Sequence, residues 1–411
     1  MSHPLQAPGP NDVVPGPSAA GLDAPPPATA AAGKAAPRSG RERFPALDGL
    51  RGIAALVVLV FHVLLVSPVF DSPENSRGPV DASWWITHTP LNLFWAGPQA
   101  VYVFFVLSGF VLALPAATIR WRAYYPQRLL RLYLPVWAAV ALAVVLVSAF
   151  PRDPQPWLSQ WWSERQPGSG WKGVVRDAVL VLPGTGSWNS PLWSLRYEML
   201  FSLLLPLYLV AGRILPRWGL LRIGVLLVAL AVAEGTGRET LAYLSMFGFG
   251  VLLAADRDRL AHLATRVEAQ GRRAWIALAA VCVLLLNAEL VLLVEPGQVV
   301  RGVAMALQLA GATLLIFLAL HWRSAQRALT LGWVQWVGLR SFALYLVHEP
   351  IVLSIVAAAP RLHVVGYLIV ATPVCLVAAH LFYGAVEVPA HRLSRTAGRR
   401  FSGAPAGART T

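Results

Sequence analysis

Long apolar stretches alternate with short polar connections along most of the chain from Phe44 onward. A helix needs about 20 mainly apolar residues to cross the hydrocarbon core of a bilayer. The pattern therefore predicts an all-α fold, a polytopic membrane helix bundle with about ten transmembrane helices. The predicted spans are residues 48–68, 98–116, 131–150, 193–212, 219–235, 239–255, 274–294, 301–320, 334–357 and 364–385.

The two ends of the chain differ from this apolar middle. Residues 1–43 are rich in Pro, Ala and Gly, and such a segment buries too little apolar surface to offset its ordering entropy. We therefore expect a disordered cytoplasmic leader at 1–43, a membrane domain at 44–392 and a basic cytoplasmic tail at 393–411. The stretch 174–187 is apolar but interrupted, and we expect it to form a re-entrant or interfacial part of a long external loop.

Basic residues are distributed unevenly between the two sets of connections. With the N-terminus in the cytoplasm, the cytoplasmic segments hold 24 of the 34 Lys and Arg residues, and the external segments hold nine. Cytoplasmic loops of membrane proteins carry an excess of basic residues. The distribution predicts that both termini are cytoplasmic, and we expect the protein in a bacterial cytoplasmic membrane.

Composition supports a membrane protein and argues against a nucleic-acid partner. Hydrophobic residues make up 56% and charged residues 13% of the chain, whereas soluble domains carry about 25% charged residues. The net charge is +14, but the basic residues form short clusters between apolar runs rather than one basic helix or domain. Cys282 and Cys375 lie in separate apolar runs, so neither a disulfide framework nor a metal site is predicted.

Two polar side chains, Arg51 and His62, interrupt the first predicted span. Eleven residues correspond to about three helical turns and about 16 Å, so both side chains point toward the same side of the bundle. An imidazole titrates near neutrality and can take a proton from a hydroxyl group. His62 is therefore either a general base or a buried histidine that is hydrogen-bonded to a neighbouring helix.

Other charged and small residues lie at or inside the predicted spans. Arg128 and Arg131 share one helical face at the expected cytoplasmic border, where they suit phosphate recognition but also match ordinary positive-inside anchoring. Glu198 lies about one turn into the fourth span, and a carboxylate there needs a histidine or arginine partner on a neighbouring helix. Ser108 and Gly109 are small enough to let two helices approach closely.

Tryptophans are concentrated in the external segment 151–192, which includes Trp161 and Trp162, and Trp193 follows at the outer boundary of the next span. They form either an interfacial aromatic belt or a cover over the outer mouth of the bundle. In the second interpretation, the three residues offer aromatic faces to a sugar or macrocycle and are candidate substrate-binding residues.

Five segments, in this order along the chain, resemble the acyltransferase-3 family of integral membrane acyltransferases. They are FPALDGLRGIAALVVLVFHV at 44–63, FFVLSGFVL at 104–112, RLLRLYLPVW at 128–137, PLWSLRYEMLFSLLLP at 191–206 and SFALYLVHEPI at 341–351. The resemblance covers about residues 44–392. One departure is Tyr102, which stands where the family usually has an acidic residue.

The resemblance implies a ten-helix enzyme that moves an acyl group, often acetyl, from cytoplasmic acyl-CoA to a hydroxyl. Family acceptors include sugars, glycolipids, polysaccharides and macrolide-type molecules. The residues that match the family's motifs are Arg51 and His62 in the first helix, Arg128 and Arg131 in R-x-x-R, and Trp193, Ser194 and Glu198 in W-S-L-x-x-E.

These matches lead to a working hypothesis for the site. Arg128 and Arg131, with Arg51 as a further candidate, hold the phosphates of acyl-CoA, the expected co-substrate. His62 acts as general base, and Glu198 orients it or stabilises its protonated form. Direct attack on the thioester and a covalent acyl-enzyme both stay open. No permanently bound cofactor is expected.

A transporter or permease is the main alternative, and a non-catalytic scaffold is a third. Transporters commonly contain internal repeats with broken helices at matching positions. The two halves of this sequence show no such repeat, which argues modestly against transport.

A reporter fused after residue 411 tests the predicted topology. The excess of basic residues on the cytoplasmic side predicts that a reporter active only in the cytoplasm is active in this fusion. A reporter that requires export should be inactive at the same position. Activity of the exported reporter would contradict the model of ten spans with cytoplasmic ends.

Overall fold

A computed structural model describes residues 43–72, 78–115, 118–165, 170–214, 219–292 and 298–401. Within these ranges the regular structure is helical and contains no strand, which confirms the all-α fold. The predicted leader, apart from Arg43, and residues 402–411 of the predicted tail lie outside the described ranges.

Each predicted span coincides with an apolar helix. The helices are α1 (Pro45–Leu64), α4 (Gly97–Ala113), α5 (Trp121–Ala149), α8 (Leu192–Ile214), α9 (Gly219–Gly235), α10 (Glu239–Ala255), α12 (Arg272–Leu286), α14 (Gln298–His321), α16 (Gly332–Ala358) and α17 (Val364–Phe382). Six helices of the described chain are long and apolar enough to cross a membrane, or seven if α10 and the helix bent away from it count as one span. The chain is thus a multi-pass membrane protein, and the number of ten spans stays a prediction.

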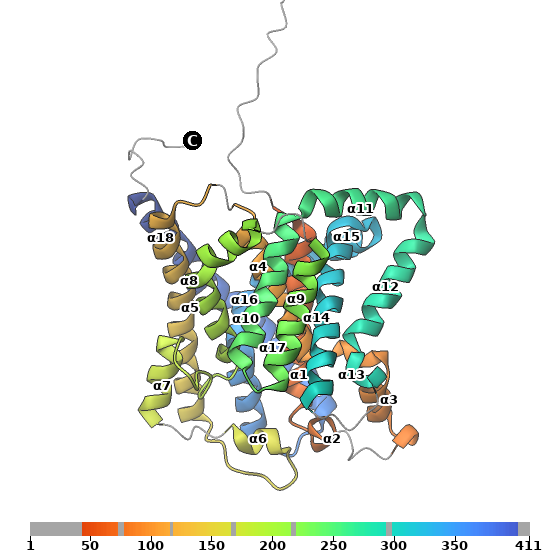
Figure 1. Cartoon of the computed structure of the whole chain (residues 1–411). Helices are drawn as coiled ribbons and strands as arrows, with labels where there is room; N and C mark the ends of the chain where they lie inside the picture. The colour runs from red at the N-terminus through yellow and green to blue at the C-terminus, as the bar shows by residue number, and fades with distance from the viewer. Residues whose placement is uncertain are drawn as a thin grey trace, which may run out of the picture. The chain divides into compact units, whose positions relative to one another are not determined.

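Shorter helices connect these spans. They are α2 (Pro68–Asp71), η2 (Gly78–Val80), α3 (Ala82–His88), η3 (Pro90–Phe94), α6 (Gln160–Glu164), α7 (Gly170–Val179), α11 (Arg257–Ala269), α13 (Ala288–Leu292), α15 (Arg323–Leu329), the π-helical turn η4 (Tyr383–Glu387) and α18 (Val388–Phe401). Helices α11, α15 and α18 lie at the upper end of the bundle in Figure 1, and α2, α3, α6 and α7 lie toward the lower end. The upper group belongs to the connections predicted to be cytoplasmic, and we call that end inner and the opposite end outer. Helix α18 extends past the boundary predicted at residue 392.

Helix α16 is the most enclosed of the candidate spans, with 78% of its apolar window buried. It packs against α1, α5 and α17. At its contact with α1, a Cβ atom on Gly52 would lie 2.6 Å from the backbone nitrogen of Gly338, and a Cβ on Gly338 would overlap the carbonyl oxygen of Asp48. Two glycines therefore allow the backbones of α1 and α16 to touch, as small residues do in membrane helix pairs.

A second pair of glycines joins α4 to α10. A Cβ atom on Gly109 would overlap the carbonyl oxygen of Phe247, and one on Gly250 would overlap that of Val106. The small-residue role predicted for Gly109 is thereby confirmed. Ser108 faces a different neighbour, since its hydroxyl donates to Glu198 at 3.4 Å.

Helix α1 ends earlier than the apolar pattern predicts. The span was expected to reach residue 68, but the helix stops at Leu64, and the short helix α2 begins at Pro68. A proline at the start of α2 is suited to a first helical turn, where no backbone N–H is needed. As a result His62 lies in the last turn of α1, near the outer end of the bundle rather than in the middle of a span.

Replacing Gly338 by alanine tests the contact between α1 and α16. The added methyl group overlaps the backbone of α1, and overpacking typically costs about 1–3 kcal/mol. We expect a lower midpoint of thermal unfolding in detergent. Gly332→Ala in the same helix is the matched control, because nothing lies within 4 Å of its Cβ position. Equal midpoints for the two variants would contradict the role assigned to the contact.

Candidate active site

Two polar clusters lie at opposite ends of α1. Arg51 belongs to the inner cluster and His62 to the outer one, and eleven residues of helix separate them by about 16 Å. Both side chains face α16, because Arg51 lines a pocket with Ser341 and Phe342 while His62 contacts His348. The prediction that Arg51 and His62 point to the same side is therefore confirmed.

The inner cluster surrounds a strongly basic pocket. Its charged lining residues are Arg43, Arg51, Arg128, Arg131, Arg395, Asp48, Glu198 and Glu387, and His391 is beside them. The pocket brings together four of the residues singled out from the sequence, namely Arg51, Arg128, Arg131 and Glu198. Guanidinium groups that converge in this way suit a ligand with several phosphate oxygens.

Glu198 belongs to this inner cluster. Its carboxylate forms an ion pair with Arg128, and Nε of Arg128 also donates to the hydroxyl of Ser202 at 2.9 Å. The sequence-based hypothesis has Glu198 orienting His62, but the structure pairs Glu198 with Arg128 and Ser108 instead. The residue that contacts His62 is a different one, His348.

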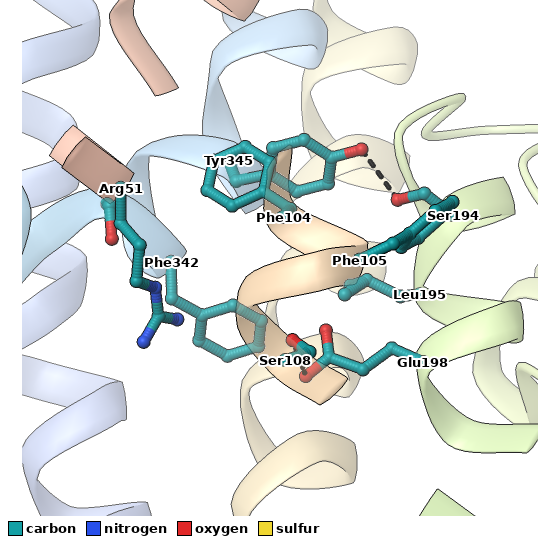
Figure 2. A pocket seen from close by; sticks show the side chains of 10 residues that line it. Arg51, Phe104, Phe105, Ser108, Ser194, Leu195, Glu198, Phe342 and Tyr345 are labelled. Carbon is teal, nitrogen blue, oxygen red and sulfur yellow. Dashed lines mark hydrogen bonds between the residues drawn. The ribbon is translucent and has the colours of Figure 1, made fainter. Parts of the chain in front are cut away.

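A second pocket adjoins the inner cluster and shares Arg51, Glu198 and Phe342 with it (Figure 2). Its lining residues are Arg51, Phe104, Phe105, Ser108, Ser194, Leu195, Glu198, Ser341, Phe342 and Tyr345. The Tyr345 hydroxyl lies 2.6 Å from the hydroxyl of Ser194, and the Tyr345 ring packs 5.8 Å from the ring of His348. The lining between Arg51 and Tyr345 is largely aromatic, and Tyr345 places the pocket next to His348.

The hydrogen bonds around two histidines define which ring nitrogens carry hydrogen. Nδ1 of His348 lies 2.9 Å from the carbonyl oxygen of Tyr345, so Nδ1 donates and Nε2 is left to accept. That Nε2 lies 3.2 Å from Nδ1 of His62, which is also 2.9 Å from the carbonyl oxygen of Val58. Both neighbours of His62 Nδ1 are acceptors, so Nδ1 carries the hydrogen. The neutral His62 ring therefore keeps the lone pair of Nε2 available as a base.

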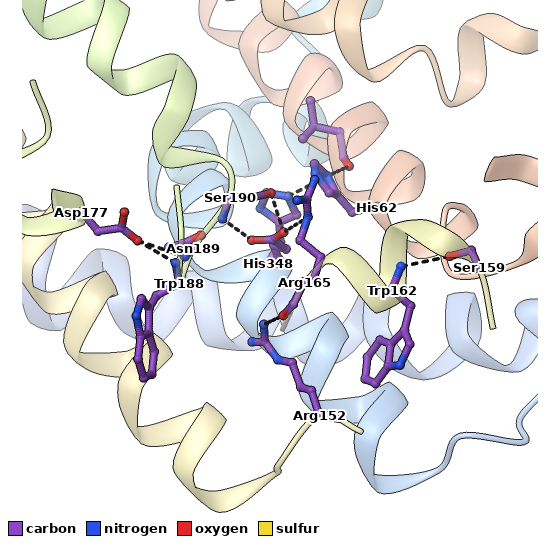
Figure 3. A network of polar contacts seen from close by, with 12 residues as sticks. His62, Arg152, Ser159, Trp162, Arg165, Asp177, Trp188, Asn189, Ser190 and His348 are labelled. Carbon is purple, nitrogen blue, oxygen red and sulfur yellow. Dashed lines mark hydrogen bonds and ion pairs between the residues drawn. The ribbon is translucent and has the colours of Figure 1, made fainter. Parts of the chain in front are cut away.

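The outer loop is attached to α16 directly beside His348 (Figure 3). Glu349 accepts hydrogen bonds from the backbone N–H and the hydroxyl of Ser190. The side-chain amide of Asn189 donates to the carbonyl oxygen of Leu346 at 2.8 Å. These contacts fix residues 189 and 190 against the helix turn that holds His348.

A buried carboxylate organises the same loop. Asp177 of α7 accepts four backbone N–H groups, those of Gly186, Ser187, Trp188 and Asn189. A carboxylate that receives several backbone donors holds the loop in one conformation. The segment that precedes α8 is therefore preorganised before any ligand binds.

The three candidate tryptophans occupy different surroundings. The ring of Trp161 lies 5.7 Å from that of His62, so it belongs to the outer cluster. Trp162 is 1% exposed, and its Nε1 donates to the carbonyl oxygen of Asp153 at 3.0 Å. Trp161 is buried as well, at 7% exposed, and the substrate-binding role of both residues stays a prediction. Trp193 packs among aromatic rings of α4, α8 and α10 instead.

Several residues of the outer cluster received little or no weight from the sequence. His348 and Glu349 belong to the segment SFALYLVHEPI but were given no role in the working hypothesis, and in the structure they point to different partners, His62 and Ser190. Tyr345, one turn earlier, shares the His348 face and could have been found from that spacing. Ser190 has no local signal, because its role depends on a helix far along the chain. In the described part of the chain, no group of His, Cys, Asp and Glu residues is suited to hold a metal ion.

The sequence matches a known protein family over most of its length. A family model described as an acyltransferase domain matches residues 44–380, which include all five segments quoted above. The chain belongs to the acyltransferase-3 family. No solved structure matches this member of the family.

Two relatives of this acyltransferase-3 protein are informative. Acyltransferase MdmB from Streptomyces mycarofaciens is 31% identical over 185 residues, which cover 42% of this chain and 41% of MdmB. YrhL from Bacillus subtilis (strain 168), named as a peptidoglycan O-acetyltransferase, is 25% identical over 391 residues, 84% of this chain and 54% of YrhL. The chain spans about half the length of these curated relatives.

The ion pair in the inner cluster can be tested by thermal unfolding. Glu198→Ala leaves Arg128 without its partner while both side chains are largely enclosed, at 19% and 11% exposed. We expect a lower unfolding midpoint, and adding Arg128→Ala should recover part of the loss, because no unpaired charge then remains. Arg43→Ala is the control, since its pair with Asp48 is exposed and such pairs contribute little. A double variant no more stable than Glu198→Ala would contradict the coupling.

Proposed function

We propose that this protein transfers an acyl group, acetyl or another short chain, from acyl-CoA to a hydroxyl group of a sugar, glycolipid, polysaccharide or macrolide-type acceptor. Membership of the acyltransferase-3 family supports group transfer over the transporter alternative. The name of YrhL supports acetyl as the acyl group and a glycan as the acceptor. We further propose that the membrane is the bacterial cytoplasmic membrane.

The donor end of the proposed site is the inner basic pocket. CoA carries several phosphate groups, and Arg51, Arg128 and Arg131 converge on one pocket at the end of the bundle predicted to be cytoplasmic. Planar guanidiniums make bidentate contacts with phosphate oxygens. Acyl-CoA is made in the cytoplasm, so a donor pocket on this side suits its supply.

The pocket that adjoins the inner cluster suits the pantetheine arm of acyl-CoA. The pantetheine arm of CoA is long and thin and carries two amide groups and a hydroxyl. The pocket beyond Arg51 is lined by aromatic rings, and by hydroxyl groups at Ser108 and Ser194. Its far end is at Tyr345, beside His348. An extended arm anchored at the arginines would therefore present its thioester close to the histidine pair.

The chemistry then follows from the hydrogen-bonding of His62. Its Nε2 lone pair removes the proton from the acceptor hydroxyl as the hydroxyl oxygen attacks the thioester carbonyl carbon. The carbon–sulfur bond breaks, CoA leaves as a thiolate, and the proton held by His62 passes to that sulfur. His348 positions His62, because its Nε2 shares the Nδ1 hydrogen of His62 with the carbonyl oxygen of Val58, and both acceptors stabilise the imidazolium.

The acceptor end is the outer cluster. His62 lies in the last turn of α1, near the end of the bundle predicted to be external, and Trp161 lies beside it. An aromatic ring there suits the apolar face of a sugar ring or macrocycle. The donor and the acceptor would thus enter from opposite ends and meet at His62. The observation that carries the proposal is the Nε2 lone pair of His62 beside His348, whose ring is 5.8 Å from that of Tyr345 in the pocket that begins at Arg51.

Two substitutions separate the chemical step from donor binding. His62→Asn keeps a polar side chain but cannot take a proton, and loss of a general base lowers the rate by roughly 10²- to 10⁴-fold. We expect transfer of label from radioactive acetyl-CoA in host membranes to be almost lost, with the Kd for CoA unchanged. Arg131→Ala should instead raise that Kd by roughly ten- to a hundredfold, because a charge-assisted contact contributes about 1.5–3 kcal/mol.

His262→Asn is the matched control for the histidine substitution. His262 is exposed on α11, so this variant should retain full transfer. Substantial turnover by His62→Asn would place the base elsewhere. Wild-type membranes that bind CoA but transfer no label would argue against the acyltransferase and for a transporter.

A further inference from the structure

Two arginines of the outer loop are left unused by the proposed transfer reaction. Arg152 follows α5 and Arg165 follows α6. The side chain of Arg152 is 6% exposed, and its Nη1 donates to the carbonyl oxygen of Arg165 at 3.1 Å. In the described part of the chain, its Nε and Nη2 are buried and have no hydrogen-bond partner.

The free atoms of Arg152 share one edge of the guanidinium group. Nε and Nη2 together form the side that binds both oxygens of a carboxylate or phosphate in a bidentate contact. Burial lowers the pKa of Arg152, but a guanidinium group still keeps its proton in proteins. A buried cation with an unfilled bidentate edge is costly unless an anion occupies it.

The nearby carboxylates do not fill this edge. Glu349 lies 3.6 Å from Nε of Arg165 and already accepts two hydrogen bonds from Ser190. Asp177 accepts four backbone N–H groups of its own loop. Glu349 acts on both arginines, but no carboxylate of the described chain hydrogen-bonds the Nε and Nη2 edge of Arg152.

Arg165 is also close to the proposed point of transfer, and Arg152 is hydrogen-bonded to its backbone. The guanidinium group of Arg165 lies over the ring of Trp161 at 5.3 Å, and that ring is 5.7 Å from the ring of His62. Figure 3 shows the Arg165 side chain extending toward His62 and His348, with the side chain of Arg152 reaching the backbone of Arg165.

We propose that Arg152 and Arg165 form a subsite for a negatively charged group, a carboxylate or a phosphate, on the acceptor. The inference rests on the proposed function and adds that the acceptor is anionic. Binding of the charged group at Arg152 and Arg165 positions a neighbouring hydroxyl of the same molecule toward Nε2 of His62. A neutral acceptor leaves the bidentate edge of Arg152 empty and binds more weakly.

Binding measurements on the purified full-length protein, without acyl-CoA, test the subsite. The probes are D-glucuronate, D-glucose 6-phosphate and D-glucose, which share a sugar ring but differ in charge, and isothermal titration calorimetry gives each Kd. We expect at least one anionic probe to bind about tenfold or more tightly than glucose, because charge-assisted hydrogen bonds are stronger than those between neutral groups. Preference for the carboxylate or for the phosphate identifies which group the acceptor carries.

Substitutions then locate the binding. Arg152→Gln should remove the preference for the anionic probe, and Arg152→Lys should retain part of it, because lysine keeps the charge but not the bidentate edge. Arg176→Gln, in the exposed face of α7, is the matched control and should leave every Kd unchanged. If the glutamine variant does not fold, a weaker anion Kd in the lysine variant still supports the subsite.

Other binding results would contradict the anion subsite. Equal binding of all three probes to the wild type, or an anion preference that survives both Arg152 substitutions, overturns the proposal. So does anion binding that disappears in Arg131→Ala, since the probe would then occupy the inner pocket. Failure of the proposed function is measured separately: Arg152-dependent anion binding without release of CoA from acetyl-CoA would retain the subsite but reject acyl transfer.

Discussion

The contact between α1 and α16 is the constraint on which the site depends. Gly52 and Gly338 bring the two backbones together, and in each helix a histidine follows its glycine by ten residues, at positions 62 and 348. Because the two helices run in the same direction, equal offsets bring His62 and His348 to the same level. A larger side chain at either glycine would separate the helices and break the 3.2 Å contact between the imidazoles.

Charge is divided between the two ends of this helix pair. The inner end collects guanidiniums with fewer carboxylates, which creates a field attractive to a polyanion. The outer end holds the imidazoles of His62 and His348, whose hydrogen bonds leave Nε2 of His62 free. The pocket that extends from Arg51 to Tyr345 is lined mainly by aromatic rings. Polar groups within a bilayer are costly unless they are paired or line a pocket. Their separation into two clusters is therefore consistent with two ligands that enter from opposite ends.

The outer loop completes the site through attachments to α16 rather than to its own neighbours in sequence. Ser190 and Asn189 bind the helix turn at Glu349 and Leu346, while Asp177 holds the preceding loop by its backbone. A loop preorganised in this way loses little conformational entropy when a ligand binds. It also brings Trp161 and Arg165 close to His62, so the proposed acceptor site is formed by residues distant from His62 in sequence.

The sequence by itself determined the helical class and the position of each apolar helix, and it singled out Arg51, Arg128 and Arg131 as one phosphate-binding group. These features follow from local patterns, because a bilayer requires long apolar helices and makes every charge within them conspicuous. Only the tertiary structure decided that Glu198 pairs with Arg128, that His348 supports His62 and that Trp162 is buried. A hydrogen-bond partner and a buried face depend on which helices become neighbours and how far each one extends. No local pattern encodes that choice, because lipid and helix are equally apolar and the pairing is decided by packing at small residues such as Gly52.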